Sequence, residues 1–176
     1  MYSAPTSGLM HTPSHSIDNL TGGWMAFQES PNTATAWGTQ YRAIYVPIRV
    51  VDRCVVRKLG FASAAAAAGN VDVGLYDANG ARLVSSGPTT KTGTGVQVVD
   101  VADTTIGPGL YYIGLNNDTT TDTVTALAGT APVPAARGVL TETLGGVALP
   151  ASASWAVDNV LSFIPIVTAL LVTEVS

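Results

Sequence analysis

Apolar and polar residues alternate through much of the chain after residue 40. Between residues 70 and 84 every second position is apolar on either side of the sequence Asp-Ala-Asn-Gly at 77–80. Alternation with a period of two is typical of half-buried strands. Asn79 and Gly80 both tolerate the positive φ that a tight turn between twisted strands requires. This stretch therefore predicts a β-hairpin, around which the rest of the chain is organised.

The same pattern predicts further strands on both sides of the hairpin. In one of them Val55, Leu59 and Phe61 are expected to share a face, with Val56 on the opposite face. Pro47 places another strand at an edge or a bulge, because proline cannot donate to the ladder. Besides the hairpin, the predicted strands cover residues 41–51, 55–64, 96–101, 110–115, 123–127 and 159–172, the last with a bend at Pro165, and the segments 85–95, 116–122 and 129–156 are predicted as loops.

No segment shows the 3.6-residue period of an amphipathic helix, and the alanines at 64–68 are too few to nucleate one. The seven or eight antiparallel strands are best buried as two sheets packed face to face. We therefore predict an all-β fold, a jelly-roll-like β-sandwich over residues 41–176. An immunoglobulin-like sandwich is the alternative.

Residues 1–40 differ from the rest, since they are rich in proline, serine and threonine and follow neither period. This composition predicts an extended N-terminal arm. The arm nevertheless carries large apolar side chains that are costly to leave in water, so it is expected to lie on its own domain or to dock on a neighbouring protein. The residues predicted to anchor it are Trp24, Met25, Phe27 and Trp37.

Charged residues make up only 11% of the sequence, while 47% of it is hydrophobic. So little charge predicts that part of the surface is covered by other subunits, which favours a homo-oligomer. The net charge of -4 repels phosphate backbones and argues against a nucleic-acid partner. The basic residues clustered between 42 and 58 are expected to form a solvated face or to meet acidic groups of a neighbouring subunit. The apolar run 160–172 is too short for a membrane span, so no membrane insertion is expected.

The N-terminal residues lack the basic and apolar regions of a signal peptide, so we expect synthesis in a cytoplasm. Catalytic motifs are missing from the sequence. The two histidines, His11 and His15, flank a proline in the arm, and the single Cys54 is predicted to be a buried, inert thiol. Most acidic residues fall at strand ends and turns, where aspartate caps the backbone. We therefore predict a protein that is not an enzyme and uses no cofactor.

Two weaker candidates for ligand binding remain. Asp118 and Asp122 lie in an oxygen-rich loop that could hold a loosely bound Ca²⁺, although the spacing of a dedicated calcium loop is missing. Trp155, Tyr76 and Tyr112 could contact a glycan, because sugars dock their apolar faces on aromatic rings. Burial in the core or at a subunit contact is the competing interpretation for each ring.

Several stretches of the chain form a set of recognisable motifs. They are Arg42-Ala-Ile-Tyr-Val-Pro-Ile48, residues 69–87, Gly107-Pro-Gly-Leu-Tyr-Tyr-Ile-Gly-Leu115, Gly138-Val-Leu-Thr-Glu142, Leu149-Pro-Ala-Ser-Ala-Ser-Trp155 and Phe163-Ile-Pro165. Together they resemble small β-sandwich proteins that are encoded among the virion genes of tailed bacteriophages. The resemblance covers about residues 41–172 and carries no catalytic residues.

This resemblance implies a virion component, of the tail or fibre type or of the capsid decoration type. The resulting hypothesis is a non-enzymatic structural protein, assembled in the host cytoplasm as a trimer and located in the virion. Its arm docks on other virion proteins and its sandwich is exposed for attachment to the host. The alternative is a carbohydrate-binding module that recognises glycans of the host cell wall.

Overall fold

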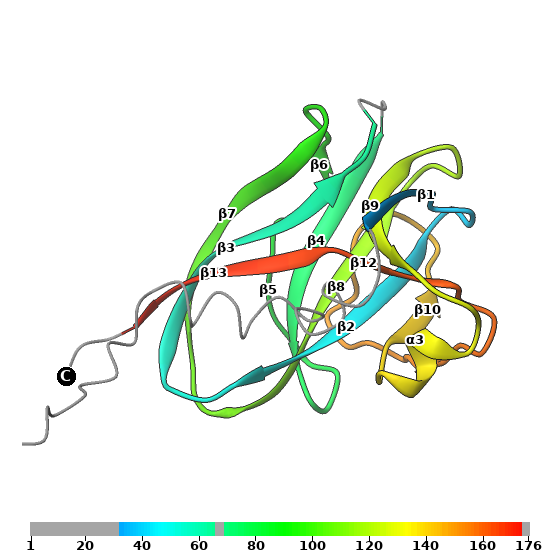
Figure 1. The fold of residues 1–176 in the computed structure, drawn as a ribbon. Coiled ribbons are helices and arrows are strands. Elements are labelled where there is room, and N and C mark those ends of the chain that lie inside the picture. Colours follow the sequence, from blue (N-terminus) through cyan, green and yellow to red (C-terminus); the bar gives the residue numbers. More distant parts are fainter. Residues whose placement is uncertain (1–31, 66–68, 174–176) are drawn as a thin grey trace, which may run out of the picture.

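The chain folds into two antiparallel sheets that pack face to face (Figure 1). The computed structural model describes residues 32–65 and 69–173, so Trp24, Met25, Phe27 and both histidines lie outside the described residues. Sheet A consists of β1 (Asn32–Ala36), β3 (Cys54–Ser63), β7 (Gly95–Ile106), β9 (Thr123–Ala128), β12 (Phe163–Pro165) and β13 (Val167–Thr173). Sheet B consists of β2 (Arg42–Val50), β4 (Asn70–Asp77), β5 (Arg82–Ser85), β6 (Thr89–Thr90), β8 (Gly109–Asn117), β10 (Leu140–Thr143) and β11 (Ala156–Val157).

The predicted all-β sandwich is confirmed. In chain order β2, β3, β4, β7, β8 and β9 alternate between sheet B and sheet A. The described residues form thirteen strands rather than seven or eight, because short segments within the predicted arm and loops also pair. A single helical turn, α3 (Val133–Ala136), lies in the segment that was predicted as loop.

The core fills the space between the two sheets. Its side chains come from alternate positions of the long strands, and at residues 71–75 and 111–115 these are the positions that the alternation predicted. Burial of each such side chain contributes about 1.5–3 kcal/mol. The largest fully buried aliphatic and aromatic side chains of this core are Trp37, Ile44, Val46, Leu59, Phe61, Leu75, Ile113, Leu115 and Leu161.

The predicted hairpin is formed by β4 and β5. The Asp77 carboxylate accepts hydrogen bonds from the backbone N–H groups of Asn79 and Ala81, each at 2.9 Å. Gly80 adopts a φ of +88°, as the turn chemistry predicted, but Asn79 does not take a positive φ. The Asp77 side chain, together with Gly80, closes the turn, so a second left-handed residue is not needed.

A β-bulge changes which side chains of β3 point into the core. Lys58 and Val56 oppose consecutive residues of β13, which makes Arg57 an extra residue in the ladder. As a result Val56 is fully buried on the same side as Leu59, while Val55 is only half-buried. The prediction that Val55 shares the face of Leu59 is therefore wrong at this position.

Pro47 lies in β2 opposite Tyr112 of β8. On the other side of β2, the partner strand β10 covers only residues 42–45. Within the described residues, Pro47 therefore faces no ladder partner on that side. The residue occupies a local edge, which agrees with its missing N–H donor.

The segment 32–40 belongs to the sandwich and not to an arm. β1 pairs with β9, and the side chain of Trp37 is fully buried with its ring 6.0 Å from that of Phe163. Trp37 is thus a core residue, which corrects its predicted role as an assembly anchor. The sequence Asn-Thr-Ala-Thr-Ala of β1 contains no large apolar residue, so its alternation gave too weak a signal to be recognised.

Candidate functional site

Four aromatic rings, the aromatic cluster, pack together on the outer face of sheet B. Tyr45 of β2, Tyr76 of β4 and Tyr112 of β8 stand on three neighbouring strands, and Trp155 lies over them. The centroid of the Trp155 ring is 5.1 Å from that of Tyr45 and 4.6 Å from that of Tyr112. The Tyr45 and Tyr76 rings meet edge to face at 5.1 Å. Such contacts add to the burial of the rings and fix their orientation.

Gly114 of β8 makes room for the aromatic cluster. A Cβ atom at this position would lie 2.8 Å from the ring of Tyr45 and 3.2 Å from that of Tyr76. Carbon atoms do not approach each other to 2.8 Å, so a Cβ atom here would displace the Tyr45 ring, and glycine lets the two rings pack directly on the sheet.

The two buried phenols act as hydrogen-bond donors. Tyr45 donates to a carboxylate oxygen of Glu142 at 3.0 Å, and Tyr76 donates to the carbonyl of Pro150 at 2.7 Å. Burial raises the pKa of Tyr45 far above its usual range, and the neighbouring Tyr76 and Glu142 raise it further. Burial also raises the pKa of Tyr76. Both hydroxyls therefore stay protonated and hold the cluster in place.

The structure places the three predicted glycan contacts together but exposes only two of them. Tyr76 is fully buried, so it cannot contact a glycan, whereas Tyr112 and Trp155 are half-buried at the surface. Tyr45 completes the cluster and was missed by the sequence reasoning. Its position between the core residues Ile44 and Val46 places it on the outer face, and this parity was readable from the sequence.

Hydrogen bonds hold the segment 144–155, which carries Trp155, against sheet B. The Asp72 carboxylate accepts the backbone N–H of Leu149 at 2.8 Å and the hydroxyl of Ser86 at 3.2 Å. The Asn116 amide donates to the carbonyls of Gly146 and Val147 at 2.9 and 2.8 Å. The half-buried ring of Trp155 is therefore presented by a segment that is hydrogen-bonded to sheet B.

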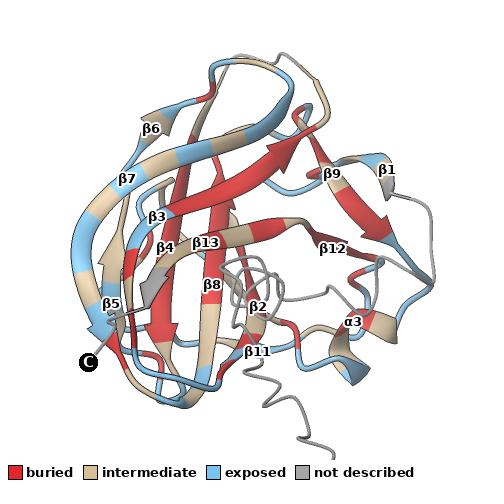
Figure 2. Cartoon of the chain, turned by 60° about the vertical axis from the view of Figure 1, so that its left-hand side comes forward, coloured by how far each residue is buried: buried red, intermediate tan, exposed pale blue. Residues whose placement is uncertain are grey.

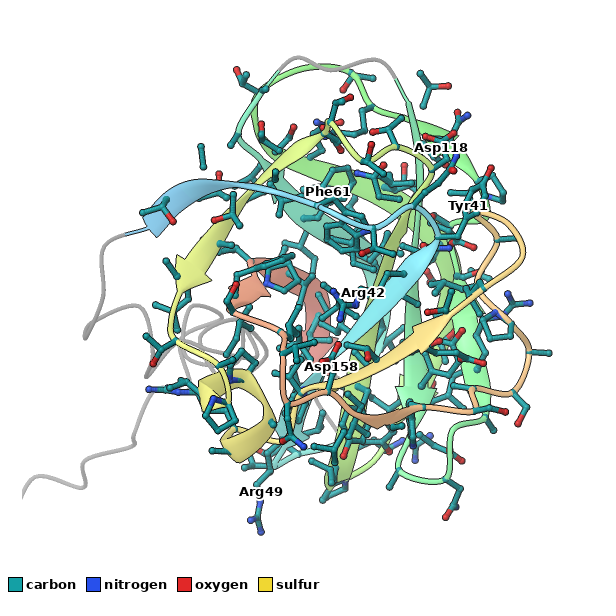
Figure 3. All side chains as sticks on the ribbon, turned by 90° about the vertical axis from the view of Figure 1, so that its right-hand side faces the viewer. Tyr41, Arg42, Arg49, Phe61, Asp118 and Asp158 are labelled. Atoms are coloured by element: carbon teal, nitrogen blue, oxygen red, sulfur yellow. The ribbon has the colours of Figure 1, made fainter. Side chains whose placement is uncertain are left out.

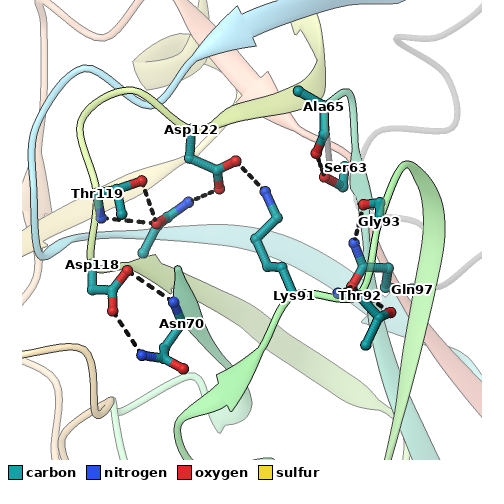
Figure 4. A network of polar contacts seen from close by, with 11 residues as sticks. Ser63, Ala65, Asn70, Lys91, Thr92, Gly93, Gln97, Asp118, Thr119 and Asp122 are labelled. Carbon is teal, nitrogen blue, oxygen red and sulfur yellow. Dashed lines mark hydrogen bonds and ion pairs between the residues drawn. The ribbon is translucent and has the colours of Figure 1, made fainter. Parts of the chain in front are cut away.

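A second feature is a polar network at one end of the sandwich (Figure 4). The side chains of Lys91 and Asp122 are both 0% exposed, and the Lys91 ammonium donates to one carboxylate oxygen of Asp122. The amide nitrogen of Asn117 donates to the other oxygen of the same carboxylate. Sequence reasoning missed Lys91, because its threonine-rich surroundings gave no sign of burial.

The two predicted calcium ligands turn to different partners within this end of the molecule. Asp118 accepts hydrogen bonds from the backbone N–H of Asn70 at 2.8 Å and from its side-chain amide at 2.9 Å. Asp122 faces the Lys91 ammonium instead. Within residues 32–65 and 69–173, no group of three or more histidine, cysteine or acidic side chains gathers as a metal site would require.

β7 forms an edge of sheet A, the β7 edge (Gly95–Ile106). Within the described part of the chain, β7 pairs with β3 alone. Its residues are exposed or half-buried along most of its twelve-residue length, whereas β4 and β8 are mostly buried (Figure 2). Val96 and Val98 of this strand are 68% and 44% exposed. The β7 edge thus presents apolar side chains to solvent beside an open ladder.

Three side chains of the basic segment 42–58 pair with acids of the same chain. Lys58 lies 2.8 Å from Asp100, and Arg57 lies 3.3 Å from Asp103, both at the surface along β7. Arg42 pairs with Asp158 in a more buried position, and Figure 3 shows the two side by side, with Arg49 pointing away.

Comparison with known proteins finds no family model, no curated protein and no solved structure that matches this chain.

Among the described residues, no helix has the length and the apolar character to cross a membrane. Burial and the nearby Asp52 raise the pKa of the buried Cys54 thiol, which disfavours the reactive thiolate form.

Proposed function

We propose that this chain is a non-enzymatic structural protein of a tailed-bacteriophage virion, of the tail or fibre type or of the capsid decoration type. It assembles as a homotrimer through the β7 edge, with residues 1–31 docking on other virion proteins. The observation that carries the proposal is the β7 edge itself, a long open strand with exposed valines.

Soluble monomers normally protect such an edge with short strands, prolines, bulges or inward-pointing charges. β7 has twelve residues and no proline, and its two charged residues are already paired with Lys58 and Arg57 of β3. Its pairing with β3 is irregular only between Asp100 and Thr104, which leaves the part that carries Val96 and Val98 in regular register. An open ladder of this length can accept a strand or a sheet edge from another copy. The low charge of the whole sequence supports the same conclusion, because an uncharged exterior favours association.

The oligomer is tested by native mass measurement of the full chain and of a Val96→Asp, Val98→Asp double variant. We expect a trimer for the wild type and monomers for the variant, because two carboxylates would be buried without partners in the interface. Val160→Asp is the matched control, since Val160 is 77% exposed but lies outside β7. An unchanged oligomer in the double variant would exclude the β7 edge as the interface.

The docking role of the arm is tested by deleting residues 1–31 and no more. A longer deletion would remove β1 and the buried Trp37, and so would damage the sandwich itself. We expect the shortened chain to keep its thermal unfolding temperature and its oligomer but to be missing from assembled particles. Normal incorporation of the shortened chain would refute the docking role.

A second candidate function rests on the aromatic cluster. The half-buried rings of Trp155 and Tyr112, 4.6 Å apart, could support binding of a host cell-wall glycan. A glycan array with the full chain and a Trp155→Ala variant separates the two functions. Specific binding that is lost in the variant favours attachment, provided that the variant keeps its unfolding temperature. The absence of any binding leaves the architectural role.

A further inference from the structure

Lys91, Asp122 and Asn117 come from three different segments and meet in the interior. Lys91 follows β6, Asn117 ends β8, and Asp122 precedes β9. The side chains of Lys91 and Asp122 are 0% exposed, and Asn117 is 1% exposed as a residue. One carboxylate, that of Asp122, bridges the ammonium of Lys91 and the amide nitrogen of Asn117.

As a simple ion pair this arrangement is poorly compensated. The Lys91 ammonium has three N–H donors, but among the described residues it donates to Asp122 alone. A buried charge is tolerated when its pairing and its remaining hydrogen bonds are complete. An amide nitrogen in the same place has a single N–H, which the Asp122 carboxylate could satisfy by itself. The geometry therefore suits a lysine that has become part of an amide.

The carboxamide of Asn117 is held as an electrophile would be. Its oxygen accepts a hydrogen bond from the backbone N–H of Thr119 at 3.0 Å and from the Thr119 hydroxyl at 3.4 Å. Donors to a carbonyl oxygen stabilise the negative charge that develops there during attack on its carbon. Its nitrogen, the leaving group, contacts the same carboxylate as the attacking amine.

We propose that Lys91 and Asn117 join in an intramolecular isopeptide bond, with Asp122 transferring the protons. The proposal goes beyond the proposed function and does not depend on it. Burial out of water and fixed neighbouring groups are the conditions under which an amine can displace an amide without an external catalyst.

The reaction balances within the three side chains. Asp122 takes one proton from the Lys91 ammonium, and the free amine attacks Cγ of Asn117, forming the N–C bond and a tetrahedral oxyanion held by Thr119. The protonated Asp122 gives its proton to the Asn117 nitrogen. The Asp122 carboxylate then accepts one of the two protons on the Lys91 nitrogen. The C–N bond of the carboxamide breaks and releases ammonia. Ammonia takes the remaining proton from Asp122 and leaves as ammonium, which restores the carboxylate.

The new bond would join the segment after β6 to the end of β8. Between them lies the first residue of β4, since Asn70 pairs with Thr90 of β6 and Val71 pairs with Asn117 of β8. The resulting ring contains the whole of β7, and the bond fastens the segment that leads into the β7 edge to sheet B. Such a cross-link restricts the unfolded chain as a disulfide does.

Mass spectrometry of the full chain tests this inference. Loss of ammonia makes the intact protein about 17 Da lighter than its sequence. Lys91→Met and Asp122→Asn are expected to restore the full mass, and Lys58→Met, at the one other lysine of the sequence, is expected to keep the deficit. Because each protein is compared with its own sequence mass, processing of the N-terminus affects all of them equally.

Digestion of the wild type gives an answer that needs no variant. Trypsin cuts after arginine and free lysine, and Lys91 is the single site between Arg82 and Arg137. We expect residues 83–137 to remain one fragment, about 17 Da below its sequence mass. Cleavage after Lys91 into two fragments of full mass overturns the proposal. A deficit of about 18 Da, from loss of water, mapped to Lys91 and Asp122, overturns the assignment of Asn117 as the electrophile.

Discussion

The carboxylate of Asp72, buried in the middle of sheet B, accepts the backbone N–H of Leu149 at 2.8 Å although the two residues are 77 positions apart. This bond joins a central strand to the segment that carries Trp155. It also leaves the Asp72 carboxylate buried away from water. Burial is the largest influence on this group, and it raises the pKa of Asp72 in spite of its hydrogen bonds.

Replacing Asp72 by asparagine should therefore change how stability depends on pH. The raised pKa means that the native state favours the protonated acid. The contribution of Asp72 is thus fully present below its unfolded pKa of about 4 and is lost as the pH rises through the folded pKa. Asp72→Asn removes this loss and keeps an acceptor for Leu149. We expect the variant to be at least as stable as the wild type at pH 7 in urea unfolding, with a shallower decline between pH 4 and 7.

Asp100→Asn serves as the control for Asp72→Asn, because the Asp100 side chain is 82% exposed and its replacement should cost less than about 1 kcal/mol at pH 7. A loss of several kcal/mol at pH 7 for Asp72→Asn would contradict the expectation. It would mean that the hydrogen bonds of the ionised carboxylate outweigh the cost of its burial.

Asp158 should give the opposite dependence. Burial acts to raise its pKa, but the backbone N–H of Val160 and the guanidinium of Arg42 outweigh it, so the pKa is lowered. The stability from this group is present above the unfolded pKa of about 4 and is lost as the pH falls through the lowered folded pKa. Asp158→Asn should cost about 1–2 kcal/mol at pH 7 and much less near pH 2. Urea titrations at both pH values check this, and an equal loss at both would refute it.

Variants of Trp37 test how much the segment 32–40 contributes to the stability of the core. Its indole N–H is buried and makes no hydrogen bond within the described residues. Trp37→Phe removes that unsatisfied donor along with some volume, so we expect a change in unfolding free energy within about 1 kcal/mol. Trp37→Ala should cost about 3–5 kcal/mol, because it leaves a cavity beside Phe163. A small loss for the alanine variant would show that the segment 32–40 contributes little to the core.

Gly114→Ala should disturb the aromatic cluster more than a glycine replacement elsewhere in the same region. Its new Cβ would meet the Tyr45 ring at 2.8 Å, and overpacking of this kind costs about 1–3 kcal/mol. We expect a lower unfolding temperature and an altered near-ultraviolet circular dichroism spectrum, to which the packed aromatic rings contribute. Gly107→Ala is the matched control, since no atom lies within 4 Å of its added Cβ and its φ is not positive. Equal effects of the two variants would argue against the tight packing at Gly114.

The regular strands were predictable because their signal is local. The alternation at residues 70–75 and 110–115 marks both the strand and the face that it buries. The bulge at Arg57 was not predictable, because an extra residue in a ladder depends on pairing with β13, more than a hundred positions away along the chain. β1 and β10 were missed for a related reason, since short strands owe their existence to the neighbours that they pair with.

The candidate sites also combine features that a local pattern predicts with features that depend on distant segments of the chain. The tyrosines of the aromatic cluster follow from the parity of their strands, but the covering of Tyr76 depends on the segment 144–155, whose course no local pattern determines. The oxygen-rich loop at residues 116–122 was recognised as polar, yet the partners of its two acids, Asn70 for Asp118 and the Lys91 ammonium for Asp122, come from distant segments. A lysine in a threonine-rich stretch predicts exposure, and only the folded arrangement reveals its burial.

The burial of Lys91 has a practical consequence for labelling. The sequence contains two lysines, and the side chain of Lys58 is 47% exposed on β3 while that of Lys91 is 0% exposed. An amine-reactive fluorophore therefore has one accessible lysine on the folded protein, besides the α-amine. A dye placed there stands next to the β7 edge, where its emission would report directly on the approach of another subunit.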